Sequence, residues 1–308
     1  MIIKTLLVFS FIIILLFIIC YYNILIDESK DKSKGKDKMI SYDIIYSIIA
    51  HENPESLHSM IYNIKKFNKD INILICLNLN NMMYKNFDIN DYNYVVINTN
   101  YYDKMIHTHH IMKAHMDNYF YLCDNNINFN SIMLLASNCM FVKHMLLPQN
   151  TTVYYNVHEE ETDLNSLNDW SNFTYFKENN KIINMFNDMR IQLKITTHEG
   201  ALYSNILFDK ICNFIIDYNI INMIEKEMCF EEIIFPSLEA YFNNGVMVKR
   251  YCKIYWMNYN FTPTIDDIKE LLANNVDDFY IVKRIPRILR NKNNSLVKYI
   301  NTELFGNY

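Results

Sequence analysis

Two adjacent glutamates, Glu231 and Glu232, stand directly in front of an apolar run in EKEMCFEEIIFPSLEAYF, residues 225–242. A carboxylate can take up a proton during catalysis, and it can also stabilise the first turn of a helix, whose unpaired N–H groups carry partial positive charge. The apolar residues that follow recur at helical spacing, and Pro236 falls in or near the first turn, where its missing N–H costs little. The pattern therefore predicts a helix over about 231–243. It leaves open whether one glutamate has a chemical role.

A second group of candidate residues is the histidine cluster HTHHIMKAH, which contains His107, His109, His110 and His115. On the helix that we predict over about 105–121, positions 107 and 110 are neighbours, while the other two lie on other faces. No Cys-x-x-Cys pair or third-ligand spacing supports a zinc site. The pattern therefore favours histidines that lie at the surface or line a crevice.

Basic residues concentrate near the C-terminus in FYIVKRIPRILRNK, although the chain as a whole is acidic. Lys283 and Arg284 fall in a strand-like run over 278–285, and Arg250 closes the run GVMVKR upstream. Such side chains can bind a diphosphate, with arginine supplying bidentate contacts, although a solvated tail is an equal alternative. The chain has no Asp-x-Asp, the spacing with which many nucleotide-sugar enzymes hold a divalent metal ion. A nucleotide-sugar enzyme built on this chain would have to neutralise the diphosphate with fixed cations.

The overall composition is that of a folded protein with a sizeable core. The chain has 308 residues, of which 51% are hydrophobic, and a formal net charge of −5. The negative charge argues against a nucleic-acid partner. With only 4 glycines, a phosphate-cradling loop and a dinucleotide-binding fingerprint are nearly excluded, and no Gly-x-Ser-x-Gly elbow occurs.

The segment TLLVFSFIIILLFIICYYNILI, residues 5–26, has no charged residue and predicts an uncleaved, single-pass transmembrane anchor. At about 1.5 Å per residue it spans about 33 Å, enough for a hydrocarbon core of about 30 Å. Residues 27–41, which begin with DESKDKSKGKDKM, predict a charged stalk. Residues 42–308 then have the composition of one folded domain.

The orientation of the predicted anchor stays open. Five lysines follow it and only Lys4 precedes it, which favours a cytosolic domain. Asn-x-Ser/Thr matches at Asn150, Asn172, Asn260 and Asn293 favour a lumenal domain, but an Asn-rich chain produces such matches easily. Six cysteines outside the anchor permit disulfides without showing them.

Strands and helices alternate through the first half of the domain. YDIIYSIIA predicts a buried strand over 44–50, and Asn53-Pro54 then begins an amphipathic helix that runs to about Phe67. Two further strands are predicted over 71–78 and 92–99. This alternation predicts an α/β domain with a largely parallel sheet.

Ligands of such sheets usually lie off the carboxyl ends of the strands, which places His51 and Glu52 at a binding crevice. The second half predicts a polar loop over 159–180, helices over 181–192 and 203–218 in addition to 231–243, a short helix IDDIKELLA capped by Thr264, and strand-like runs over 245–256 and 278–285.

Six segments, in consistent order over about residues 44–300, resemble the core 2/I-branching β-1,6-N-acetylglucosaminyltransferases and their xylosyltransferase relatives. These segments are IIYSIIAHENPESLHSMIYNI, MKAHMDNYFYL, SIMLLASNCMFVK, THEGALYSNILFDKICNFI, FEEIIFPSLEAY and FYIVKRI. The resemblance implies a single catalytic domain of GT-A type, a Rossmann-like α/β fold, behind the membrane anchor. It also implies an inverting, metal-independent transfer of a GlcNAc- or xylose-type sugar to a hydroxyl of a glycan or glycoprotein. The donor that it implies is a nucleotide sugar, with a UDP-sugar as the first candidate. The family favours a Golgi- or ER-type lumenal domain.

The resemblance also assigns roles to individual residues. Glu232 matches the family's catalytic base, and Glu231 is its acidic neighbour, which on this interpretation mainly serves the helix end. On the donor side Lys283 matches well and Arg250 loosely, and we add Arg284, His51 and Glu52 as candidate donor contacts. On the acceptor side we expect His198, Glu199 and Gly200, although the family's serine is replaced there. No metal ion or other cofactor is expected.

Two alternatives stay open. The first is a membrane-tethered, non-catalytic protein that retains the fold and binds a sugar or nucleotide, which the imperfect matches at Arg250 and in the acceptor loop favour. The second and weaker alternative is a histidine-dependent metallohydrolase.

Overall fold

The computed structural model describes residues 41–51, 53–89, 92–100, 109–147, 171–224, 228–253, 263–274, 279–283, 285 and 294–304. The predicted anchor over residues 5–26 and the predicted stalk up to Ile40 lie outside these ranges. Within the described ranges, no helix combines the length and the apolar character that crossing a membrane requires. The described residues all belong to one compact unit that starts at Ser41.

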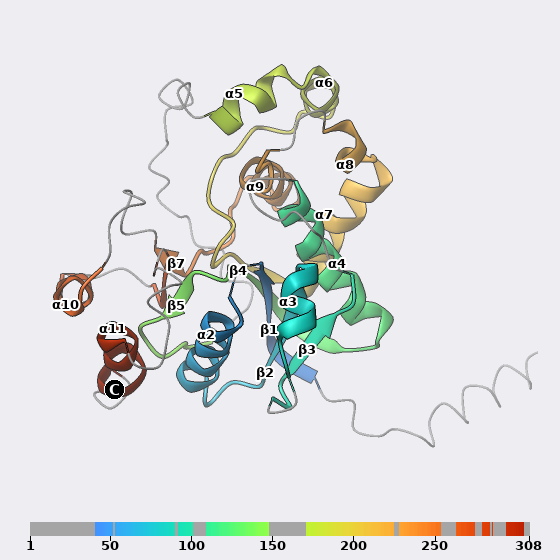
Figure 1. The fold of residues 1–308 in the computed structure, drawn as a ribbon. Coiled ribbons are helices and arrows are strands. Elements are labelled where there is room, and N and C mark those ends of the chain that lie inside the picture. Colours follow the sequence, from blue (N-terminus) through green and yellow to red (C-terminus); the bar gives the residue numbers. More distant parts are fainter. Residues whose placement is uncertain are drawn as a thin grey trace, which may run out of the picture. The chain divides into compact units, whose positions relative to one another are not determined.

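The larger sheet has five strands in the order β3-β2-β1-β4-β6 (Figure 1). Their bounds are β1 (Ser41–Ala50), β2 (Ile73–Leu79), β3 (Val95–Asn98), β4 (Asn128–Ala136) and β6 (Leu202–Ser204). β1 to β4 are parallel to one another, and β6 is antiparallel to β4. The structure thus confirms a mixed α/β fold with a largely parallel sheet. The order β3-β2-β1-β4 is that of the first four positions of a Rossmann sheet, in which the crevice for a ligand opens where the strand order reverses, between the carboxyl ends of β1 and β4.

Helices cover both faces of this sheet, so its central strands are buried on both sides. In β1, Ile44, Tyr46 and Ile48 pack on α2 (Pro54–Phe67), while Ile45 faces the cluster that contains α4 (His110–Asp124). Successive side chains of a strand point to opposite faces, and a sheet covered on both faces needs apolar residues at every position. This is why β1 is apolar from Ile44 to Ala50, with Ser47 as the one polar residue of that run.

The remaining helices divide between two hydrophobic clusters. The cluster that contains α2 also contains side chains of the small sheet described below and of α3 (Asn81–Asn86), α10 (Ile265–Ala273), α11 (Ser295–Lys298) and the π-helix η3 (Tyr299–Leu304). The cluster that contains α4 also contains side chains of α5 (Ser171–Glu178), α6 (Asn180–Asp188), α7 (Asn205–Asp217), α8 (Ile220–Met223) and α9 (Glu231–Phe242).

Two helix starts follow the sequence signals closely. The side chain of Asn53 accepts a hydrogen bond from the backbone N–H of Glu55 at 2.8 Å, and Pro54 occupies the first helical position of α2. At α10, Thr264 and Asp267 form a reciprocal capping box. Both starts confirm the sequence-based boundaries.

A second, smaller sheet lies beside the first and has the order β5-β8-β7. Its strands are β5 (Cys139–Phe141), β7 (Cys252–Lys253) and β8 (Ile281–Lys283), with β8 antiparallel to β5 and parallel to β7. β8 is the central strand and ends at Lys283, which pairs with Cys139 of β5, while β7 pairs with Ile281 and Val282.

The structure differs from the sequence-based prediction in three elements of the second half. Of the strand-like run predicted over 245–256, only Cys252–Lys253 form a strand among the described residues. Residues Leu202–Ser204 form strand β6, where we predicted the start of a helix, because the segment pairs with β4 and Ser204 then caps α7. Ser171–Glu178 form helix α5 within the predicted polar loop, because Phe176 packs on Phe186 and Phe230. The six cysteines outside the predicted anchor are all free thiols.

Candidate active site

Three segments that are distant in sequence meet beside the carboxyl end of β4. The stretch 191–200 is joined to β4 by a hydrogen bond from the Gly200 N–H to the Leu134 carbonyl at 2.8 Å. The start of α9 is joined to the same stretch by a hydrogen bond from the Thr196 N–H to the Glu232 carbonyl at 3.0 Å. The end of β8 reaches it through an ion pair between Lys283 and Glu199. The crevice expected from the strand order is therefore lined by charged side chains.

Pro236 explains how α9 is tied to the stretch 191–200. It is the sixth residue of α9, so our placement of it in or near the first turn was wrong. Because proline has no N–H, the Glu232 carbonyl four residues earlier lacks its usual partner within the helix. The Thr196 N–H takes that place, and the Ser237 hydroxyl accepts a further hydrogen bond from the Lys194 N–H at 2.9 Å.

Gly200 is required by the backbone next to these residues. Its φ of +74° is a conformation that other residues rarely adopt, and a Cβ atom there would lie 2.4 Å from the backbone nitrogen of Cys252. The Gly200 carbonyl also accepts a hydrogen bond from the Tyr251 N–H at 2.9 Å. The glycine thus lets β7 approach the stretch that carries His198 and Glu199. Its predicted contact with an acceptor stays a prediction.

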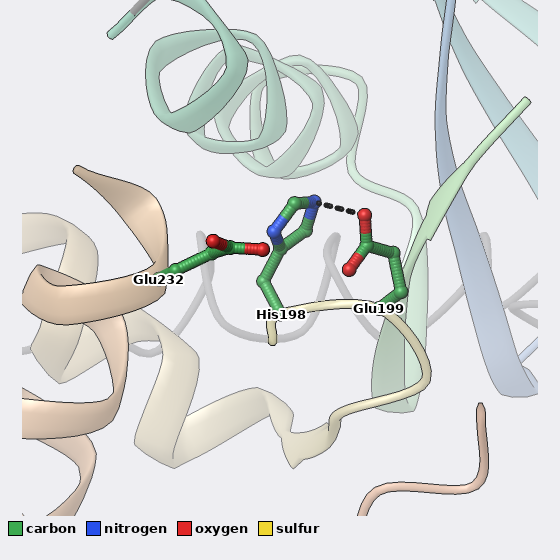
Figure 2. Close-up of side chains that lie close together, drawn as sticks. All are labelled: His198, Glu199 and Glu232. Atoms are coloured by element: carbon green, nitrogen blue, oxygen red, sulfur yellow. Dashed lines mark ion pairs between the residues drawn. The ribbon is translucent and has the colours of Figure 1, made fainter. Parts of the chain in front are cut away.

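His198 lies between two carboxylates, those of Glu199 and Glu232 (Figure 2). The Nε2 atom of His198 is 3.5 Å from Oε1 of Glu199, and one ligand atom from each of the three side chains lies within 4.8 Å of the others. His198 and Glu199 are only 4% and 2% exposed, whereas Glu232 is half-buried. Of these three side chains, that of the half-buried Glu232 is the one that an incoming molecule can reach most easily.

Lys283 supplies the positive charge of this cluster. Its ammonium group pairs with Oε1 of Glu199, and its side chain is 15% exposed. Burial lowers the pKa of Lys283. The negative charge of Glu199 and, to a smaller degree, that of Glu232 raise this pKa by more than burial lowers it, so it lies above its ordinary value. Burial alone raises the pKa of Glu199, and the positive charges around that carboxylate outweigh this and lower it. Both partners are therefore charged at neutral pH.

Burial disfavours the charged form of both neighbours of this ion pair. Burial lowers the pKa of His198 to about 4, and the positive charge that keeps Glu199 ionised is therefore that of Lys283. Burial and the adjacent Glu232 raise the pKa of Glu231 well above its ordinary value. Glu231 lies in the first turn of α9, is 1% exposed and lies 3.9 Å from Nδ1 of His198. Its role at the helix end stays a prediction.

Arg250 has a structural role in this arrangement. It pairs with Glu239 of α9 at 2.9 Å and also donates to the carbonyls of Thr197 and Val248, at 2.8 and 2.9 Å. With a second contact to Glu239, four of its five N–H groups point at protein acceptors. Its side chain is 11% exposed. Arg250 thus fastens α9 to the two strand-like stretches beside it, and its contact with a diphosphate stays a prediction.

Some of the other predicted site residues lie at this site, and the rest lie outside the residues that the structure describes. His198, Glu199, Glu232 and Lys283 come together as described. His51 lies at the end of β1 and lines a cavity that Glu199 also lines. Glu52 and Arg284 lie outside the described residues.

This cavity lies between the carboxyl ends of β1 and β4 and has a volume of about 50 Å³. Nucleotide-sized ligands need about 300 Å³ or more, so the cavity accommodates one functional group or a few water molecules. His115 of α4 lines it together with His198 and Glu199. In the sequence His115 stands out only as a member of the histidine cluster, because the residues that line this cavity with it come from other elements.

His198, Glu199 and Glu232 form the one trio in the described ranges with the geometry to hold a metal ion. One imidazole and two carboxylates are suitable ligands for several divalent ions. However, the ammonium group of Lys283 is already bonded to Glu199, and it would repel a divalent ion at this position. The structure thus places a fixed cation beside this trio, and the absence of a metal ion stays a prediction.

No protein-family model matches the chain, and no curated protein matches it either. Among solved structures, the apo form of the glycosyltransferase GlyE of Streptococcus pneumoniae TIGR4 aligns with a TM-score of 0.37 and 9% sequence identity. The alignment covers 86% of this chain and 64% of GlyE, so the chain spans less than two thirds of that protein. A likeness this distant carries no argument for fold or function.

Proposed function

We propose that this protein is a membrane-anchored, inverting, metal-independent glycosyltransferase with a GT-A type catalytic domain. It moves a sugar of GlcNAc or xylose type from a nucleotide sugar to a hydroxyl group of a glycan or glycoprotein. Residues 5–26 anchor it, Glu232 is the general base and Lys283 holds the diphosphate of the donor. The resemblance of six ordered segments to the core 2/I-branching family supports this assignment.

One observation carries the proposal. A reachable carboxylate, Glu232, and a buried ammonium group, Lys283, converge on the same His198–Glu199 pair at a crevice beside the sheet. Their segments are separated by about fifty residues, and neither has the other as a partner in a salt bridge that the structure shows. Strand order alone places ligand sites at this edge of an α/β sheet.

The arrangement suits an inverting transfer in a single displacement. Glu232 takes the proton of the acceptor hydroxyl while the oxygen of that hydroxyl forms a bond to C1 of the sugar, and the bond from C1 to the diphosphate breaks. The leaving diphosphate keeps the electron pair of that bond, and Lys283 stabilises its charge. Positioned bases contribute about 10²- to 10⁴-fold, and preorganised cations stabilise developing charge without reorganisation.

A non-catalytic, membrane-tethered protein that binds a sugar or nucleotide is the second candidate. Four N–H groups of Arg250 donate to acceptors of the protein itself. The cavity of about 50 Å³ has room for one functional group but not for a whole nucleotide sugar. Both observations fit a protein that retains the fold and has lost turnover.

The two candidates are separated by an assay of UDP release from the full-length protein in detergent and EDTA, with UDP-GlcNAc, UDP-xylose and other UDP-sugars. We expect release from at least one donor. Lys283→Met should lower kcat/KM about 10²-fold, because the diphosphate loses a preorganised cation. Lys269→Met, which changes a largely exposed lysine of α10, should retain the full rate. Donor binding without any UDP release would favour the non-catalytic protein, and activity that EDTA abolishes would contradict the metal-independent mechanism.

A further inference from the structure

A chain of buried polar side chains lies between the sheet and α4 and ends at His115. Asn98 donates to the side-chain oxygen of Asn118 at 3.2 Å, Asn118 bonds to the Ser47 hydroxyl at 2.9 Å, and Ser47 bonds to Nδ1 of His115 at 2.8 Å. All four side chains have no exposed surface. Buried polar groups of this kind normally satisfy one another completely, so each member constrains the next.

The direction of these hydrogen bonds is fixed by a backbone carbonyl. The same side-chain nitrogen of Asn118 also lies 3.2 Å from the Cys76 carbonyl, which can only accept, so this amide group must donate to Ser47. The Ser47 proton is then free for Nδ1 of His115. The opposite arrangement would leave the Ser47 hydroxyl proton buried without an acceptor, which costs about 1–3 kcal/mol. His115 therefore carries its proton on Nε2.

Nε2 of His115 and Oε2 of Glu199 are both buried, and neither has a hydrogen-bond partner within the described ranges. His115 and Glu199 line the same cavity of about 50 Å³, and the ring of His198 lies between their segments, with its centroid 5.4 Å from that of His115. One of the two unpaired atoms is a hydrogen-bond donor and the other is an acceptor. A cavity of this volume has room for a group larger than one water molecule.

We propose that this cavity binds one hydroxyl group of a carbohydrate ligand. The hydroxyl oxygen accepts a hydrogen bond from Nε2–H of His115, and the hydroxyl proton is donated to Oε2 of Glu199. The inference rests on the proposed function for the class of ligand and adds a specificity-determining residue, His115, which the resemblance does not assign. Ser47, Asn118 and Asn98 act through His115 and are positioning residues.

The chemistry of the cavity excludes other single groups. An anionic group would face the charge of Glu199, and a metal ion would face the proton on Nε2 of His115. A methyl group would leave both polar atoms unpaired, at about 1–3 kcal/mol for each. A hydroxyl group has one proton to give and lone pairs to receive, so it satisfies both atoms together.

The first test follows His115 directly in the full-length protein, labelled with ¹⁵N-histidine and kept in detergent. Long-range ¹H–¹⁵N correlation spectra should show His115 as the neutral Nε2–H form, and Ser47→Ala should mix in the Nδ1–H form. Addition of the methyl glycosides of xylose and N-acetylglucosamine at millimolar concentrations should shift the Nε2 signal. An Nδ1–H form in the wild type, or no shift with either glycoside, would overturn the proposal.

The second test uses monodeoxy analogues of the glycoside that binds. Loss of the one hydroxyl that enters the cavity should weaken binding about threefold to tenfold, as for one neutral hydrogen bond. His115→Leu should bind the parent glycoside and the analogue equally. His115→Gln should restore part of the preference for the parent glycoside, because its amide can donate a hydrogen bond. The control variant His58→Gln, on α2, should keep the full preference. Equal binding of all analogues by the wild type would mean that the cavity holds only water and would overturn the proposal.

These readouts do not depend on turnover. A protein that shifts the His115 signal with a glycoside but releases no UDP would contradict the proposed enzyme and support the hydroxyl site. A protein that transfers sugar while His115→Leu leaves every monodeoxy preference unchanged would contradict the hydroxyl site alone.

Discussion

Two buried glutamates pair with a cation at this site, and they differ in what their remaining oxygens do. Glu239 bonds to Arg250 through both oxygens and also accepts the Val248 N–H, so the pair is closed. Glu199 bonds to Lys283 through Oε1, while Oε2 has no partner in the described part of the chain and its side chain lines a cavity. Both carboxylates are at most 2% exposed.

Because of this difference, the Glu239–Arg250 pair stabilises the fold, whereas the Glu199–Lys283 pair can also bind a ligand. Desolvation of a buried charge is costly unless hydrogen bonds satisfy all of its sites. The Glu239–Arg250 pair meets this condition internally and links α9 to its neighbours. The Glu199–Lys283 pair does not meet it, and a molecule that enters the cavity would complete it.

The largest expected effect separates the two pairs by stability. Glu239→Gln leaves Arg250 buried without its counter-charge and should lower the free energy of unfolding by about 3–5 kcal/mol. Glu199→Gln should cost less, because Lys283 can release its proton and also feels the charge of Glu232. Urea unfolding of the full-length variants in detergent measures both, and equal losses would contradict the distinction.

The pH dependence of stability should show a second signature of the Glu199 side. His198 has a pKa of about 4 in the folded protein, against about 6.5 in an unfolded chain. The unfolded state therefore takes up the proton first, and stability is complete above pH 6.5 and falls as the pH drops toward 4.

The slope should be about 1.4 kcal/mol per pH unit for each such histidine. His115, whose pKa burial also lowers, adds a loss of the same sign. The lowered pKa of Glu199 places the loss of its own contribution at still lower pH. Unfolding curves between pH 7 and pH 4 for the wild type and His198→Gln measure this; identical slopes would show that His198 titrates normally.

The smallest expected effect concerns the link between the two sides. Pro236→Ala restores an N–H that can bond to the Glu232 carbonyl within α9, in competition with the Thr196 N–H. Inside a helix alanine is more favourable than proline by up to about 3 kcal/mol, so stability should not fall, although the stretch with His198 and Glu199 loses one hydrogen bond. We expect sugar transfer to fall a few-fold, as measured by kcat with the preferred donor, and an unchanged kcat would show that the tie is not needed for positioning.

Local signals in the sequence predicted the elements around the site well. Asn53-Pro54 and Thr264 mark helix starts through contacts within a few residues, and the apolar run of β1 needs only its own pattern. β6 was missed because three residues are too few for a period to show, and its pairing with β4 joins positions about 70 residues apart.

The site itself depends on partners that the sequence does not reveal. Lys283 and Glu232 were predicted through the family resemblance, and their placement at one crevice needs the folded chain. The closed partnership of Arg250 depends on Glu239 lying beside it across a turn, and the role of His115 depends on Ser47, which is 68 residues earlier. No spacing rule connects such residues.

The central claim is that Glu232, and not its neighbour, removes the proton of the acceptor. The most direct measurement is the transfer rate of Glu232→Gln beside Glu231→Gln, with the same donor and acceptor, in EDTA and with folding checked by circular dichroism. We expect a loss of about 10²- to 10⁴-fold for Glu232→Gln, because a positioned base is removed. We expect nearly full activity for Glu231→Gln, because Glu231 is 1% exposed whereas the half-buried Glu232 can be reached by an acceptor. Wild-type activity in Glu232→Gln, or a loss confined to Glu231→Gln, would contradict it.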